Sequence, residues 1–127
     1  MKLLRTALIA ALLFVPLHAQ AKDPSASEAS AAIVPDGVAV YATLNNPGMY
    51  DAYVQSGTSD AGKVELRDGA KPTSNILIPS FGAVELKAGG PYVLITGLKG
   101  QPKAGDTIKL TLNTDGGAAL AIAAVIK

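Results

Sequence analysis

The sequence contains no cysteine and no tryptophan, and it has one histidine and two methionines among its 127 residues. Without cysteine the chain can form no disulfide and offers no thiolate to a metal. The same absence excludes lipid attachment at a cysteine. Stability must therefore come from burial of apolar side chains and from backbone hydrogen bonds, which a domain of about 95 residues can supply.

The first 21 residues have the pattern of a secretory signal peptide. Lys2 and Arg5 form a basic start, an apolar run extends from Ala7 to Val15, and small residues precede a cleavage point after Ala21. The apolar run is too short to cross a bilayer, which needs about 20 apolar residues. We therefore expect cleavage after Ala21 and a periplasmic or secreted product. Once the signal peptide is removed, we expect no membrane insertion.

The expected mature chain has few groups that could perform catalysis. His18 is removed with the signal peptide, and no serine lies in a Gly-x-Ser-x-Gly or Ser-x-x-Lys pattern. Glu65 and Glu85 could form a glycosidase pair if correctly spaced, but their outward positions on predicted strands favour a solvated face. We therefore predict that the protein is not an enzyme.

Charge and metal donors are also scarce. Removing Lys2 and Arg5 leaves nine basic against ten acidic residues, a net charge of −1, so nucleic acid is not an expected partner. Met49 is then the one remaining soft donor, which cannot by itself build a copper(I) site. The aspartates are scattered through predicted turns, where their side chains commonly accept backbone hydrogen bonds. No metal and no cofactor are therefore expected.

Alternating apolar and polar residues predict strand after strand. The patterned segments are 38–44, 50–56, 63–67, 75–78, 84–87, 92–96, 107–112 and 118–126, separated by turn signals. The segment 92–96 is apolar on both faces, which is typical of a central strand. Small and polar residues at 22–35 predict a flexible leader, so the domain is expected to span 36–127. Together these features predict an all-β sandwich.

One segment is ambiguous by periodicity alone. The alanines at 118–124 could form a helix, but the turn residues Asn113 to Gly117 and the alternating strand before them favour a hairpin. We expect a strand whose inward side chains are Leu120, Ile122, Ala124 and Ile126.

The order of several short motifs resembles one known family. Val64-Glu-Leu66, Val84-Glu-Leu-Lys-Ala-Gly-Gly90, Gly97-Leu-Lys99 and Lys103-Ala-Gly-Asp-Thr107 occur in the order and spacing of the PCu(A)C periplasmic copper chaperones. The resemblance covers about residues 38–126. It implies a Greek-key β-sandwich related to cupredoxins. It also implies a role in copper delivery to the Cu-A centre of cytochrome oxidase or in periplasmic copper handling.

The family's copper ligands are not matched. Arg67 stands where the resemblance places the first histidine, and Tyr92 and Leu94 stand in place of the His-x-Met pair. The remaining methionine should fall between Gly69 and Ser80, where the sequence has none. These differences predict a degenerate copper site. Its face would bind a periplasmic or envelope protein through Arg67, Tyr92 and Leu94, since arginine and tyrosine are favoured at interfaces. The alternative is a copper chaperone that shares ligands with a partner.

Overall fold

The computed structural model describes residues 23–127, and the expected signal peptide at 1–21 lies outside them. The described chain is all-β. Its ten strands are β1 (Ser25–Val34), β2 (Gly37–Asn46), β3 (Ala52–Ser59), β4 (Lys63–Asp68), β5 (Lys71–Pro72), β6 (Ile76–Ile78), β7 (Gly82–Glu85), β8 (Pro91–Thr96), β9 (Thr107–Thr114) and β10 (Ala119–Ile126). Every strand predicted from alternation is present, and the predicted fold class is confirmed.

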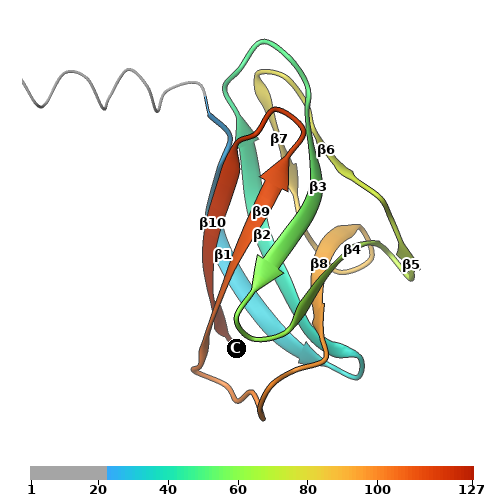
Figure 1. Ribbon diagram of the computed structural model, residues 1–127, viewed down its shortest axis with the longest axis vertical. Coiled ribbons are helices and arrows are strands. Elements are labelled where there is room, and N and C mark those ends of the chain that lie inside the picture. The colour runs from blue at the N-terminus through green and yellow to red at the C-terminus, as the bar shows by residue number, and fades with distance from the viewer. Residues whose placement is uncertain (1–22) are drawn as a thin grey trace, which may run out of the picture.

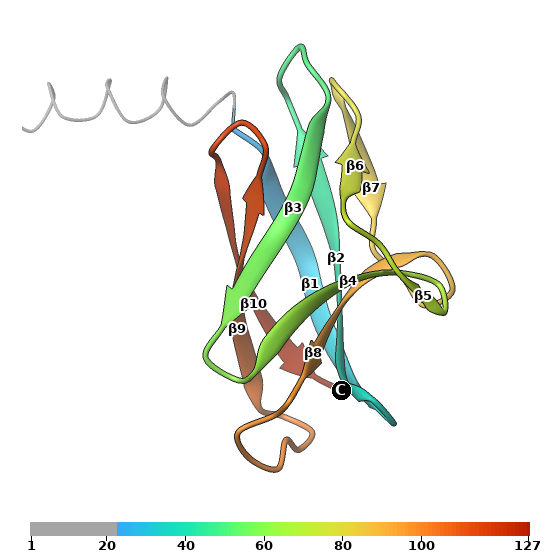
Figure 2. The same cartoon turned by 45° about the vertical axis from the view of Figure 1, so that its right-hand side comes forward.

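The strands form one continuous sheet that folds over itself into a sandwich (Figures 1 and 2). The order is β5-β4-β8-β2-β1-β10-β9-β3-β6, and β7 pairs with β2 beside this path. Sheet closure brings β3 against β4. At Gly57 of β3, a Cβ atom would lie 2.7 Å from the side chain of Val64 and 2.9 Å from that of Leu112. Glycine therefore permits the close approach of the two halves.

The core lies between the two halves and is aliphatic. Strands β9 and β10 pair antiparallel, so the predicted hairpin is confirmed over the alternative helix. Their inward side chains are all buried, as the alternation predicted: Ile108, Leu110, Leu112, Leu120, Ile122, Ala124 and Ile126. Strand β8 lies between β4 and β2, and Val93, Leu94 and Ile95 are all at most 2% exposed. This agrees with the prediction of a central strand.

The segment at 22–35, expected to be a flexible leader, instead contains strand β1. Strand β1 pairs antiparallel with β2 and parallel with β10, with Ala31 opposite Ile126. Ala31 is 1% exposed, and its carbonyl accepts a hydrogen bond from the Lys127 amide at 3.0 Å. The sheet therefore begins well before residue 36. Backbone pairing with the distant C-terminal strand holds this segment, and alanine and serine side chains give no local sign of it.

No helix in residues 23–127 is both long enough and apolar enough to span a bilayer.

Candidate functional site

The pairing of β4 with β8 brings the three predicted ligand positions together. Arg67 lies opposite Tyr92, and Glu65 lies opposite Leu94. Because side chains alternate along a strand, these four residues project from the same side of the sheet. Leu66 and Val93, between them, point into the core. We call the surface made by Glu65, Arg67, Tyr92 and Leu94 the β4–β8 face.

Arg67 is held firmly within this face. Its Nη1 donates to Glu65 Oε1 at 3.2 Å, and its Nη2 donates to the carbonyl oxygen of Ala70 at 2.7 Å. The side chain is 17% exposed, and its Nε is buried without a hydrogen-bond partner among the described residues. The guanidinium is therefore occupied by neighbours rather than extended into solvent.

The charge of Arg67 is permanent. Desolvation lowers the pKa of its guanidinium, but the interactions with Glu65 and then Tyr92 outweigh that effect, so the net shift is upward. An upward shift from an already high value leaves arginine protonated at every pH at which proteins normally fold. A metal cation placed at this position would meet a fixed positive charge.

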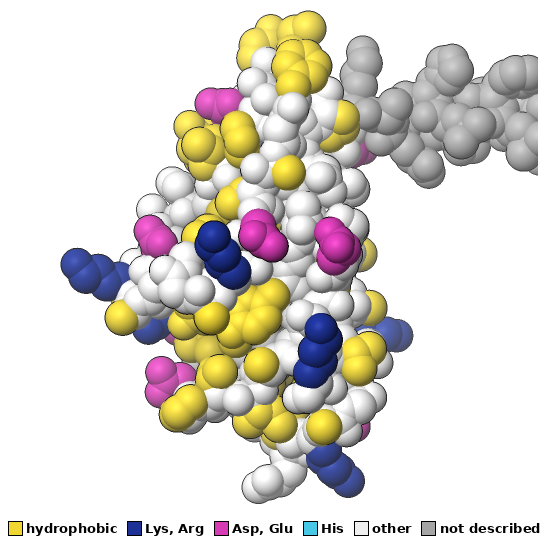
Figure 3. Space-filling model, turned by 180° about the vertical axis from the view of Figure 1, so that it is seen from behind, with side chains coloured by type: hydrophobic (Ala, Val, Ile, Leu, Met, Phe, Trp, Pro, Cys, Tyr) yellow, Lys and Arg dark blue, Asp and Glu magenta, His cyan; other side chains and the backbone are white. Residues whose placement is uncertain are grey.

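Aromatic packing covers the neighbouring part of the face. The rings of Tyr41 and Tyr92 are tilted by 53°, with centroids 6.2 Å apart, which is within the range of favourable aromatic contacts. Seen from behind Figure 1, apolar side chains gather in the middle of the molecule and are bordered by charges of both signs (Figure 3). The tyrosines are half-buried, so part of each ring is accessible.

The prediction that Leu94 contributes to an interaction surface is wrong. Leu94 is only 2% exposed. It lies on the central strand β8, with Glu65 opposite on one side and Ala39 on the other. A residue in the middle of a sheet has side chains from both neighbouring strands beside it, so a large leucine there is covered. The accessible part of the face consists of Glu65, Arg67 and Tyr92, and Tyr41 of β2 lies beside it.

These residues do not fit a copper(I) ion. The β4–β8 face offers a guanidinium, a phenol, a carboxylate and an aliphatic side chain, whereas copper(I) prefers thiolate, thioether or imidazole donors. Within residues 23–127, no group of three or more His, Cys, Asp or Glu side chains is arranged to hold a metal. Several aspartates are occupied elsewhere, as the sequence predicted: Asp51, Asp106 and Asp115 each accept a backbone amide at 3.0 Å.

A second exposed region was missed by the sequence analysis. It consists of Met49 and Tyr50 in the β2–β3 loop and Phe81 in the β6–β7 turn, which are 66%, 78% and 74% exposed. We call these three residues the apolar tip. The available signal was an apolar residue directly beside turn residues, at Gly48-Met49 and at Pro79-Ser-Phe81. Only the fold shows that the two turns meet.

Residues 17–126 match the LpqE-like family, described as "Putative lipoprotein LpqE-like". The chain belongs to this family. No curated protein sequence matches the chain. The sequence has no cysteine, so it contains no thiol to which a lipid could be attached.

Solved structures agree with the resemblance inferred from sequence. The structure "Apo PCuAC domain from PmoF1" has 20% identity and a TM-score of 0.70, covering 80% of this chain and 91% of that chain. The structure "Copper-bound PCuAC domain from PmoF2" has 16% identity and a TM-score of 0.69, with coverage of 80% and 90%. "Solution structure of CuI-DR1885 from Deinococcus Radiodurans" has 26% identity and a TM-score of 0.66, with coverage of 85% and 78%. The predicted relationship to PCuAC domains is confirmed, and this LpqE-like chain has their cupredoxin-like fold.

Proposed function

We propose that this LpqE-like protein is an exported, non-enzymatic binding protein whose copper site is degenerate. In this proposal it acts by binding a protein partner in the cell envelope through the accessible part of the β4–β8 face. One observation carries the proposal. Arg67 lies directly opposite Tyr92, with its guanidinium bound to Glu65 and to the Ala70 carbonyl, at positions where the sequence resemblance implies the family's ligands.

The chemistry of this arrangement supports a polypeptide partner over copper. Arginine and tyrosine are, with tryptophan, enriched at binding hot spots, because they combine apolar contact area with hydrogen-bonding groups. The tilted Tyr41 and Tyr92 rings, which contact each other, add area that costs little conformational entropy on binding. Export is supported by the signal-peptide pattern of the first 21 residues and by membership of a family described as lipoproteins.

A copper(I) competition titration tests the proposed loss of the metal site. The wild-type protein is expected to leave a chromophoric copper(I) chelator fully loaded, since Met49 is the one soft donor in its described residues. The variant Arg67→His/Tyr92→His/Leu94→Met restores two imidazoles and a thioether on adjacent strands and should withdraw copper from the chelator.

The matched control is Arg67→Gln/Tyr92→Phe/Leu94→Ile, which changes the same positions without adding a soft donor. Tight copper binding by the wild type would contradict the degenerate site. Binding that arises only when a partner is added would favour a chaperone that shares its ligands with that partner. A folded histidine–methionine variant that gains no copper affinity would count against the assigned ligand positions.

A further inference from the structure

The apolar tip borders an open cavity at one end of the sandwich. The cavity has a volume of about 630 Å³ and is lined by Asp23, Pro24, residues 46–52, Phe81, Thr114, Asp115, Gly116 and Ala118. The β2–β3 loop, the β6–β7 turn and the β9–β10 turn all lie at this end, opposite the C-terminus (Figure 1). Apolar side chains protrude from the same end in Figure 3. The cavity is therefore lined by segments that are far apart in the sequence, and two of them carry the apolar tip.

The loops that carry the tip are fixed to one another. Asn46 is 3% exposed, and its Nδ2 donates to the carbonyls of Tyr50 at 2.8 Å and Ile78 at 3.0 Å, while its Oδ1 accepts from the Gly48 amide at 3.0 Å. The Phe81 amide donates to the Gly48 carbonyl at 3.0 Å. The exposed side chains are thus presented by a preorganised frame, which lowers the entropy cost of binding.

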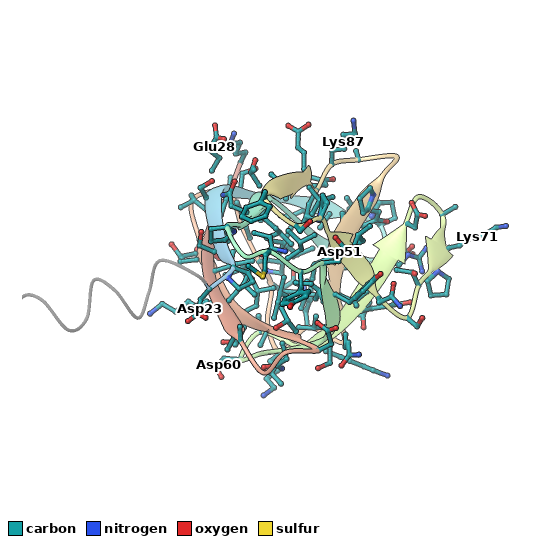
Figure 4. All side chains as sticks on the ribbon, turned by 90° about the horizontal axis from the view of Figure 1, so that it is seen from above. Asp23, Glu28, Asp51, Asp60, Lys71 and Lys87 are labelled. Carbon is teal, nitrogen blue, oxygen red and sulfur yellow. The ribbon has the colours of Figure 1, made fainter. Side chains whose placement is uncertain are left out.

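Among residues 23–127, the charged residues around the cavity have one sign. Three of its lining residues are Asp23, Asp51 and Asp115, and no lysine or arginine of this part of the chain lines it. Asp51 and Asp115 each use Oδ1 to accept a backbone amide, and Oδ2 accepts no hydrogen bond among the described residues. Figure 4 looks down on this end and shows Asp51 near its middle and Asp23 near its edge. An apolar surface is therefore combined with carboxylates that form no ion pair with any residue of the described part of the chain.

We propose that the apolar tip is a docking site for a segment of a partner protein in which a lysine or arginine is flanked by apolar side chains. The apolar flanks would pack on Met49, Tyr50 and Phe81. The cation would pair with the carboxylates and contact the aromatic faces. This site is separate from the β4–β8 face and goes beyond the proposed function. The negative cavity disfavours an anionic membrane as its occupant.

The probe for this site is a fluorescently labelled eight-residue peptide of alternating leucine and arginine, followed by anisotropy. Its partner probe replaces each arginine with citrulline, which keeps the shape and removes the charge. We expect the arginine peptide to bind at least about tenfold more tightly, and we expect that advantage to fall when the salt concentration rises to about 0.5 M. Equal affinities, or no binding of the arginine peptide up to about 1 mM, would overturn the proposal.

Two variants separate the contributions of charge and apolar surface. Asp23→Asn/Asp51→Asn/Asp115→Asn retains the Oδ1 acceptors and removes three charges, so it should abolish the preference for arginine over citrulline. Asp60→Asn, at an exposed position that does not line the cavity, should preserve it. Phe81→Gly should weaken both peptides, because it removes a ring that both would contact. An unchanged arginine preference in the triple asparagine variant would overturn the proposal.

Vesicles of phosphatidylcholine provide a third arm. If the protein sediments with these vesicles through Met49, Tyr50 and Phe81 and ignores the arginine peptide, the tip is a membrane contact and the proposal is wrong. Copper competition is unaffected by any of these variants, so failure at the tip and failure of the proposed function remain distinguishable.

Discussion

On the β4–β8 face Leu94 is 2% exposed, whereas at the apolar tip Phe81 is 74% exposed. Both are large apolar residues, Leu94 between Val93 and Ile95 and Phe81 between Ser80 and Gly82, and the sequence analysis assigned only the first to a surface. Leu94 is covered because its strand has a neighbour on each side. Phe81 is exposed because it lies in a turn at the end of the sandwich. The position of a strand within the sheet, more than hydrophobicity, decides which apolar side chain remains available for binding.

The polar residues of the two regions differ in the same way. On the β4–β8 face Arg67 is occupied by Glu65 and by the Ala70 carbonyl. Beside the tip, Oδ1 of Asp51 accepts a hydrogen bond from the Ser80 amide, and Oδ2 accepts none among the described residues. The face is largely satisfied internally, and the tip presents both apolar and ionic groups to a partner. Three substitutions test this contrast.

The largest expected effect is that of Leu94→Ala. Because Leu94 is buried, its truncation should lower the free energy of unfolding by about 2–5 kcal/mol, as for core leucines. Urea denaturation of the variant beside Leu110→Ala measures this directly. Leu77→Ala is the exposed control and should cost less than about 1 kcal/mol, because Leu77 is 42% exposed. If Leu94→Ala lowered the free energy of unfolding as little as the control does, Leu94 would be an exposed residue and its burial would be wrong.

A smaller loss is expected for Asn46→Ala. The substitution removes three hydrogen bonds and leaves the buried Ile78 carbonyl and two partly buried backbone groups without their Asn46 partner, which should cost about 1–3 kcal/mol. Amide hydrogen exchange should accelerate at Gly48, whose amide loses its acceptor. Asn45→Ala is the matched neighbour, since Asn45 makes one exposed side-chain bond to Ser27 at 3.3 Å. Equal effects of the two variants would mean that the tip is not held by Asn46.

The smallest expected effect has the opposite sign. Phe81 has a φ of +54°, a left-handed conformation that bulky residues rarely adopt. Phe81→Gly should therefore stabilise the fold by about 0.5–1 kcal/mol, measured by thermal and urea unfolding. Phe81→Ala retains the β-carbon and should give no such gain. A clear destabilisation by glycine would show that the Phe81 ring packs on the domain instead of serving a partner.

Local patterns accounted for much of the fold. Alternation in segments such as 107–112 and 118–126 predicted β9, β10 and their inward side chains, because one face of each strand packs on the core. Strand β1 was missed because its small residues lack such alternation and its partner β10 is far away in the sequence. The two-residue strand β5 was also missed, since two residues, Lys71 and Pro72, are too few to show an alternation of apolar and polar side chains.

The candidate sites divide in the same manner. The resemblance to the copper-binding family implied that Arg67, Tyr92 and Leu94 stand at its ligand positions, and the antiparallel register of β4 and β8 shows that these three residues are neighbours. Their exposure could not be read from the strand pattern, because a central strand is apolar on both sides whether its outer face is covered or open.

The sequence by itself determined the strand-rich class, the family relationship and the scarcity of soft metal donors, because these depend on residue types and on their local spacing. Only the tertiary structure decided that the N-terminal segment belongs to the sheet, that Leu94 is buried, and that Met49, Tyr50 and Phe81 meet at one end beside three aspartates. These properties arise from contacts between residues far apart in the chain. Such contacts are fixed by how the whole sheet closes on itself and leave no periodic signal in any one segment.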